Sequence, residues 1–152
     1  MRTYEDMRPE FCLLGKVLAK FVQIDKKPVE FEAGLPLFPA EIHSLATICD
    51  LAPLSLTELA RTLRVTKGAA SQLLARLEDK GLVCKEPAPD NRSRIVIQPT
   101  PLGRRAQEAH MSFHAEHDQE FLARLGSLSN EQYETFSRIC RWMDQWMDSY
   151  LR

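Results

Sequence analysis

Three of the four histidines lie close together in the sequence, at His110, His114 and His117. His110 and His114 are four positions apart, so both imidazoles would project from the same face of a helix. Neutral imidazole is a common ligand of divalent metals, and this spacing suits two ligands of one ion. The alternative is that these histidines are surface or hydrogen-bonded residues beside a small-molecule site. A metal effector is therefore one hypothesis for this chain.

Positive charge is concentrated in the middle of the chain. The formal net charge of all 152 residues is −1, yet residues 61–105 hold ten Lys and Arg against four Asp and Glu, a net +6. A basic segment between acidic flanks is typical of a nucleic-acid-binding module. A solvated basic face without a partner would have the same composition, so charge alone leaves both interpretations open.

The basic segment and the residues just before it carry the pattern of two short helices joined by a tight turn. Ser55 begins an S-x-x-E capping box ahead of apolar residues at helical spacing. A break at Arg64 leads to Thr66, a good N-cap, and to a second helix over residues 67–80. Gly81 then suits the left-handed end of that helix. The pattern predicts a helix-turn-helix, with arginine in the turn where many such motifs have glycine.

Two short strands should follow, at residues 82–86 and 94–97, the second of them β-branched. Residues 87–92 between them contain two prolines, an aspartate, an asparagine and an arginine, which favour a turn with a basic tip. A helix-turn-helix followed by a hairpin with arginines at its tip predicts a winged helix.

These motifs, in this order, resemble those of the MarR family of transcriptional regulators. Residues 66–82 are similar to the family's recognition helix, and 90–94 (D-N-R-S-R) to its D-x-R wing motif. Residues 100–103 (T-P-L-G) are similar to the opening of its long fifth helix. The resemblance covers nearly the whole chain.

The resemblance implies a mainly α fold, a winged helix-turn-helix with long N- and C-terminal dimerisation helices and a two-stranded β-wing. We expect a single domain over residues 1–152. Within it, residues 1–36 and 101–152 would form the dimerisation helices, and residues 37–100 the DNA-binding lobe.

In a helix-turn-helix the second helix enters the major groove with its N-terminal residues at the base edges. Gln72 can bond an adenine and Lys67 a guanine, whereas Arg92 suits the minor groove. The resemblance implies that Asp90 orients an arginine and that Arg94 binds phosphate. The residues expected to contact DNA are Ser55, Thr57, Thr66, Lys67, Gly68, Ala69, Ser71, Gln72, Arg76, Asp90, Arg92 and Arg94.

Apolar stripes near both ends of the chain indicate a surface that a partner covers. One stripe includes Phe11, Leu14, Leu18 and Phe21. The other follows a capping box at residues 129–132 and continues to position 150 at three- and four-residue spacing, as in a heptad seam. Packing within one chain is the alternative. The resemblance implies a two-fold homodimer, which suits a palindromic operator.

Several function classes find no support. The chain has no Gly-rich phosphate loop, no G-x-S-x-G and no H-E-x-x-H, so we expect no enzyme. No apolar run approaches the roughly 20 residues of a membrane span. The four cysteines form no C-x-x-C pair, which favours a cytoplasmic protein.

We therefore expect a DNA-binding transcriptional regulator. It would be a homodimeric repressor whose binding to a pseudo-palindromic double-stranded operator is modulated by a small molecule or a metal. The alternative is a winged-helix module that binds another protein and has no specific DNA binding.

Zinc-responsive members of the family place one histidine on the second helix and an H-x3-H pair on the fifth, and this chain resembles them. The resemblance implies that His43, His110 and His114 bind zinc or another divalent metal. Glu41 is a weaker candidate for a carboxylate that completes the ligand set.

Overall fold

The computed structural model describes residues 1–32 and 34–150. The chain divides into two compact units, Met1–Met111 and Ser112–Arg152. The boundary lies inside one continuous helix, α5 (Pro101–His117). Each unit is described in turn.

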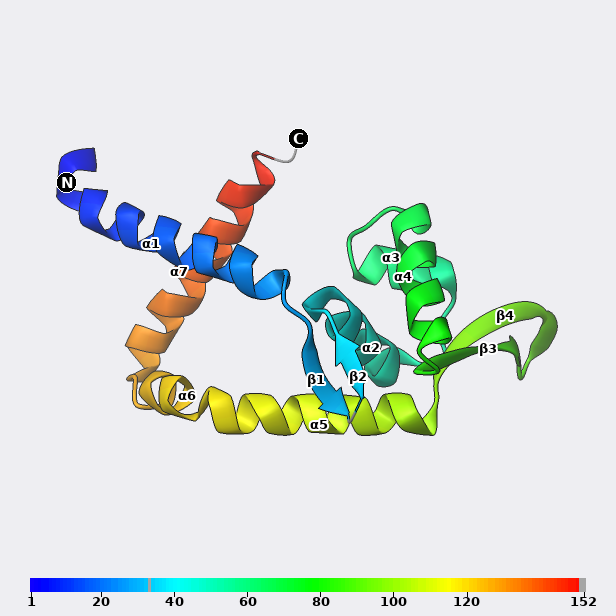
Figure 1. Cartoon of the computed structure of the whole chain (residues 1–152). Helices are drawn as coiled ribbons and strands as arrows, with labels where there is room; N and C mark the ends of the chain where they lie inside the picture. Colours follow the sequence, from blue (N-terminus) through cyan, green and yellow to red (C-terminus); the bar gives the residue numbers. More distant parts are fainter. Residues whose placement is uncertain (33, 151–152) are drawn as a thin grey trace. The chain divides into compact units, whose positions relative to one another are not determined.

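The first unit contains the helix-turn-helix and two hairpins (Figure 1). Its elements before α5 are α1 (Tyr4–Asp25), β1 (Val29–Glu32), β2 (Leu35–Leu37), α2 (Pro39–Leu51), α3 (Leu56–Thr62), α4 (Lys67–Asp79), β3 (Val83–Ala88) and β4 (Asn91–Pro99).

The predicted helix-turn-helix is confirmed at α3 and α4. The Ser55 hydroxyl accepts from the backbone N–H of Glu58, and the Thr66 hydroxyl accepts from that of Ala69. Each cap satisfies a backbone donor that the first helical turn leaves unpaired. Arg64 has φ 55°, so it takes in the turn the left-handed conformation that glycine adopts more easily.

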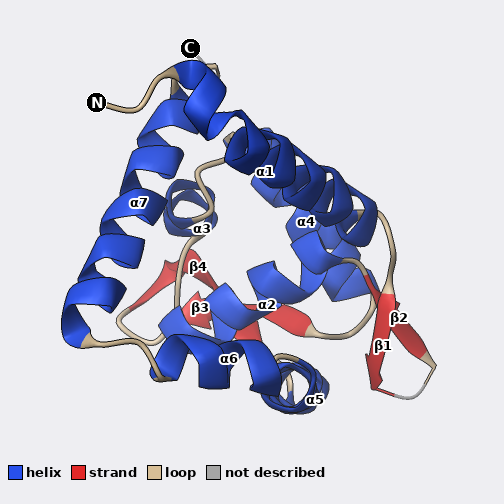
Figure 2. Ribbon diagram, turned by 90° about the vertical axis from the view of Figure 1, so that its left-hand side faces the viewer, coloured by secondary structure: helices blue, strands red, loops and turns tan. Residues whose placement is uncertain are grey.

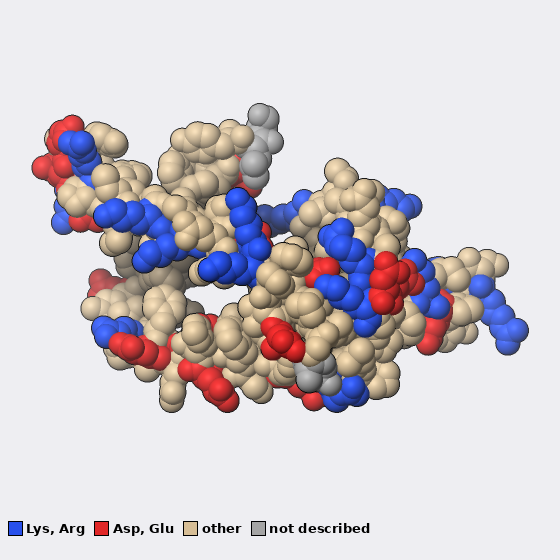
Figure 3. Space-filling view, in the orientation of Figure 1, with Lys and Arg blue, Asp and Glu red and all other residues tan. Residues whose placement is uncertain are grey.

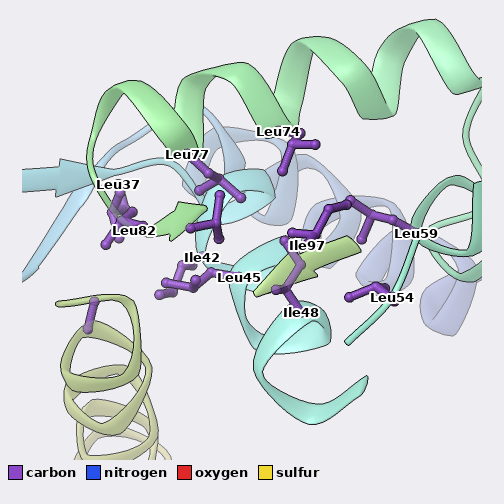
Figure 4. Packing of buried hydrophobic residues seen from close by; sticks show 12 residues of the cluster. Leu37, Ile42, Leu45, Ile48, Leu54, Leu59, Leu74, Leu77, Leu82 and Ile97 are labelled. Atoms are coloured by element: carbon purple, nitrogen blue, oxygen red, sulfur yellow. The ribbon is translucent and has the colours of Figure 1, made fainter. Parts of the chain in front are cut away.

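The core of this unit forms where α2, α4 and the wing meet (Figure 4). Leu45 and Ile48 of α2 are fully buried, as is Leu77 of α4, and Ile97 of β4 is 2% exposed. Fully burying one such side chain contributes about 1.5–3 kcal/mol to the free energy of unfolding. One face of α4 is thereby fixed to the core, which leaves its other face at the surface.

The wing is longer than predicted. β3 and β4 pair antiparallel from Val83↔Pro99 to Ala88↔Asn91, so only residues 89–90 remain as the turn. The prediction that all of residues 87–92 form the turn is wrong. The register shifts between Pro87 and Ala88, and an irregularity of this kind lets a strand accept a proline without ending.

A second hairpin, β1–β2, was not predicted. Figure 2 shows it as a sheet separate from β3–β4. Val29 pairs with Leu37 and Glu30 with Pro36, and Gly34 near the turn has φ 74°. The alternating sequence V-E-F-E before a glycine is the signal that could have revealed it.

The start of α5 is joined closely to the end of α4. The Thr100 hydroxyl donates to the carbonyl oxygen of Gly81 at 2.7 Å and accepts from the N–H of Gly103 at 3.1 Å. A Cβ at position 103 would lie 2.0 Å from the carbonyl oxygen of Leu82. The T-P-L-G sequence therefore caps α5 and allows this close backbone contact.

The second unit consists of the end of α5, α6 (Gln119–Gly126) and α7 (Asn130–Asp148). The Ser129 capping box before α7 is present, as predicted. The apolar residues of α7 lie at three- and four-residue spacing, yet none of its described side chains is buried. No helix among the described residues has the length and apolar character needed to cross a membrane.

Candidate nucleic-acid interface and histidine cluster

The N-terminal half of α4 presents polar side chains to solvent. Lys67, Ser71 and Gln72 are exposed, whereas the neighbouring residues Ala70 and Leu73 are buried. Gly68 and Ala69, also exposed, add no bulk. This face offers one cation, one hydroxyl and one amide, the groups that form hydrogen bonds with base edges in a major groove.

The two candidates at the start of α3 differ in their surroundings. Both donors of Ser55, its N–H and its hydroxyl, lie 2.7 Å from the Glu58 carboxylate. The N–H of Ser55, and after it the hydroxyl, lower the pKa of Glu58. Thr57 is exposed. Because the Ser55 donors are already engaged, Thr57 is the better placed of the two for contact with a phosphate.

At the wing, Asp90 and Arg94 form an ion pair. One terminal guanidinium nitrogen of Arg94 lies 2.8 Å and 3.0 Å from the two carboxylate oxygens of Asp90. This contact is the main cause that lowers the pKa of Asp90. Arg92 is exposed on β4 beside the turn. Figure 3 shows basic side chains at the outer end of the wing.

The structure brings the three predicted histidine ligands together. One ring nitrogen from each of His43, His110 and His114 lies within 4.8 Å of the other two. His43 is on α2, and the other two lie one turn apart on the continuous helix α5. His43 is exposed, His114 half-buried, and His110 only 5% exposed.

Two polar neighbours orient the α5 histidines. The Nδ1 atom of His110 lies 3.3 Å from Oε1 of Gln107, and that of His114 lies 2.7 Å from Oδ2 of Asp118. A metal-binding histidine commonly donates its second ring N–H to such an oxygen, which fixes the tautomer. In that tautomer, Nε2 would be the ring nitrogen that binds a cation. Sequence reasoning missed both neighbours, although their spacing of three and four residues could have revealed them.

The unpredicted hairpin covers the buried histidine. Phe31 of β1 meets the ring of His110 edge-on, with centroids 5.0 Å apart. The rings of His43 and His110 are 5.5 Å apart. His117, the fourth histidine, stacks on Phe113 and lies outside the cluster.

Glu41 of α2 pairs with cations at the C-terminal end of α4. Its carboxylate lies 2.6 Å from Nζ of Lys80 and 3.6 Å from Nε of Arg76, and it accepts the N–H of Phe38 at 3.0 Å. It is not part of the three-histidine cluster. The contacts of Glu41 are therefore with α4 and with the start of α2.

Comparisons with known proteins agree with this geometry. Residues 37–92 match the model of the MarR family. The HTH-type transcriptional regulator YhjH of Bacillus subtilis, itself described as uncharacterized, is 25% identical over 119 residues. That match covers 78% of this chain and 68% of the relative.

Two solved structures share the fold. Streptococcus pneumoniae FabT in complex with DNA matches with a TM-score of 0.68 at 16% identity, over 97% of this chain and 99% of that one. The zinc-responsive MarR family member ZitR of Lactococcus lactis also matches with a TM-score of 0.68, at 13% identity, over 93% of this chain and 99% of that one.

Proposed function

We propose that the chain is a DNA-binding transcriptional regulator of the MarR type, whose family model matches residues 37–92. It would act as a homodimeric repressor of a pseudo-palindromic operator. The exposed polar face at the start of α4, opposite a face fixed in the core, carries the proposal. Lys67, Ser71 and Gln72 would meet base edges, while Arg92 would enter the minor groove.

Contacts with phosphates would surround this base-reading face. Thr57 and Arg76 are exposed and would bind the DNA backbone on either side of it. Asp90 would hold Arg94 in position for a further phosphate. Each phosphate contact releases counterions, so operator affinity should fall steeply as salt rises.

The test of this function is selection from a random duplex library, followed by titration of the enriched sequence at several salt concentrations. We expect an enriched pair of inverted half-sites. Recovery of no enriched sequence would overturn specific DNA binding and favour a winged-helix module for protein contacts.

Dimerisation is proposed from the apolar surfaces of the terminal helices. No described residue of α1 or α7 is buried. Phe21 on α1 is 62% exposed, and Trp142 on α7 is 59% exposed. Exposed apolar side chains along a helix mark a protein interface. We expect a second copy of the chain as the partner, because it would also supply the helix that reads the second half-site.

Light scattering tests the dimer. Wild-type protein at micromolar concentration should have twice the chain mass, whereas Met143→Glu should give monomeric or aggregated protein, because a buried carboxylate without a partner is costly. A monomeric wild type would refute the proposal.

We further propose that a divalent cation, zinc in the first place, is the effector and binds at the histidine cluster. Nitrogens that share one zinc at about 2.0–2.1 Å lie at most about 4.2 Å apart, so the observed 4.8 Å limit requires only side-chain adjustment. His43, His110 and His114 would hold the ion, which would cross-link α2 to α5. The zinc-responsive ZitR protein has the same fold.

Calorimetry on metal-free protein tests this site. Wild type should bind zinc with a dissociation constant below about 10 μM. Zinc should change operator affinity by at least about fivefold. The double variant His110→Ala with His114→Ala should lose both effects and keep its fold. His117→Ala, the matched control on the same helix, should retain them. A wild type that does not bind zinc would refute this site and leave DNA binding unaffected.

A further inference from the structure

Glu41 is a buried carboxylate in the first turn of α2, and it is 3% exposed. Burial of a charged carboxylate is unfavourable unless ion pairs and hydrogen bonds compensate for its lost hydration. Among the described residues, both cations that pair with it come from α4. The charge is therefore held by the recognition helix.

The contacts of Glu41 reach the end of α4 that lies farthest from the proposed base-reading residues. Lys80, at the C-cap of α4, donates to Glu41 at 2.6 Å and to the carbonyl oxygen of Pro36 at 2.9 Å. Arg76 lies one turn earlier, at 3.6 Å from the carboxylate. The side chain of Lys80 is 26% exposed, so solvent screens this pair only in part.

Apolar side chains also join α2 to α4. Ile42 and Leu45 of α2 belong to the same buried cluster as Leu74 and Leu77 of α4. Apolar contact is non-directional and allows one helix to shift along or rotate against another. A charge-assisted hydrogen bond is directional and fixes a single register.

We propose that Glu41 is a positioning residue that sets the register of the recognition helix against α2, so that operator recognition depends on a carboxylate that does not touch DNA. This inference rests on the proposed DNA binding by α4. Glu41 is also two residues from His43, so it would pass a displacement of α2 at the histidine cluster directly to α4.

The test uses Glu41→Gln in the full-length protein. Glutamine can still accept the Phe38 N–H that begins α2, but it lacks the charge that holds Lys80. The matched control is Glu78→Gln, because Glu78 pairs with Lys85 at the same distance of 2.6 Å and joins α4 to β3 instead of α2. Lys80→Met removes the same ion pair from its other end, in case Glu41→Gln does not fold.

Two measurements without metal decide the proposal. In Glu41→Gln and Lys80→Met, operator affinity should fall about tenfold while affinity for unrelated duplex DNA stays within about twofold, as expected for a coupling between helices. Hydrogen exchange at the amides of α4 should become about tenfold faster. In Glu78→Gln, operator affinity and the exchange rates of the α4 amides should stay within about twofold of their wild-type values. Wild-type values in both folded variants would overturn the proposal.

Failure of the proposed function gives a different result. If wild type selects no operator, specific DNA binding is refuted and the exchange measurement alone decides the role of Glu41. If zinc binding is intact in Glu41→Gln but no longer changes operator affinity, Glu41 transmits the effector signal. If the zinc response is fully retained, Glu41 does not transmit it.

Discussion

Gly68 is a position where folding stability and DNA affinity should change in opposite directions. It is the second residue of α4 and is exposed. A Cβ there would meet only Oγ1 of Thr66, at 4.0 Å, and the backbone does not have a positive φ. Alanine therefore fits without strain. Because glycine is about 0.8–1 kcal/mol less favourable than alanine inside a helix, Gly68→Ala should raise the free energy of unfolding by about 0.5–1 kcal/mol.

The same methyl group should weaken operator binding. On the proposed function, this turn of α4 lies against the base edges, where a residue without a side chain lets the backbone approach closely. We expect affinity to fall by about tenfold, equivalent to about 1.4 kcal/mol. Circular dichroism should show a melting temperature higher by about 1–4 °C, and fluorescence anisotropy with the selected duplex should show the weaker binding.

Gly126→Ala is the control, because a methyl group added at this last residue of α6 would have nothing within 4 Å of it. It should leave operator affinity within about twofold of wild type. The reasoning fails if Gly68→Ala is more stable and still binds the operator as tightly as wild type, because the start of α4 would then not approach the DNA.

Three further predictions concern single contacts. Gln72→Ala should relax base preference at one position of each half-site by about 1–3 kcal/mol, measured by titrating duplexes with single substitutions. Gly103→Ala should lower the free energy of unfolding by several kcal/mol in denaturant titrations, since its methyl would overlap the Leu82 carbonyl oxygen. Arg94→Gln should raise the pKa of Asp90 towards 3.8 in an NMR titration, because Arg94 is the largest cause of the lowered pKa. The lowered pKa means that the wing ion pair stabilises the fold above the unfolded-state pKa, and that this contribution is lost as pH falls through the folded-state pKa.

The features predicted correctly depend on local sequence. The caps at Ser55 and Thr66 and the apolar spacing along α4 act within one or two helical turns, so their pattern can be read from neighbouring residues. Gly81 has φ 70°, as its place after α4 suggested. The wing was predicted in the correct place but too short, because prolines in its sequence favour a turn whereas pairing with β4 extends the strand.

The features that were missed depend on contacts between distant segments. Glu41 and Lys80 are 39 positions apart, and neither residue carries a local sign of the other. The edge-on ring contact between Phe31 and His110 also joins residues far apart in the sequence. The histidine cluster was predicted because the His110 and His114 pair is local, but His43 was added from family resemblance and not from the sequence pattern.

Rotation, not sliding, is the motion that the junction between α4 and α5 permits. The Thr100 hydroxyl bonds to both sides of the junction, and Gly103 leaves no gap beside the Leu82 carbonyl. A tilt of α4 would therefore be centred on this junction at its C-terminal end. The distance along the helix from Gly81 to Lys67 is about 21 Å at 1.5 Å per residue. A tilt of about 5° would then move the N-terminal end of α4 by about 2 Å. Hydrogen bonds to base edges tolerate only a few tenths of an ångström, and a tilt of that size would be enough to disengage them.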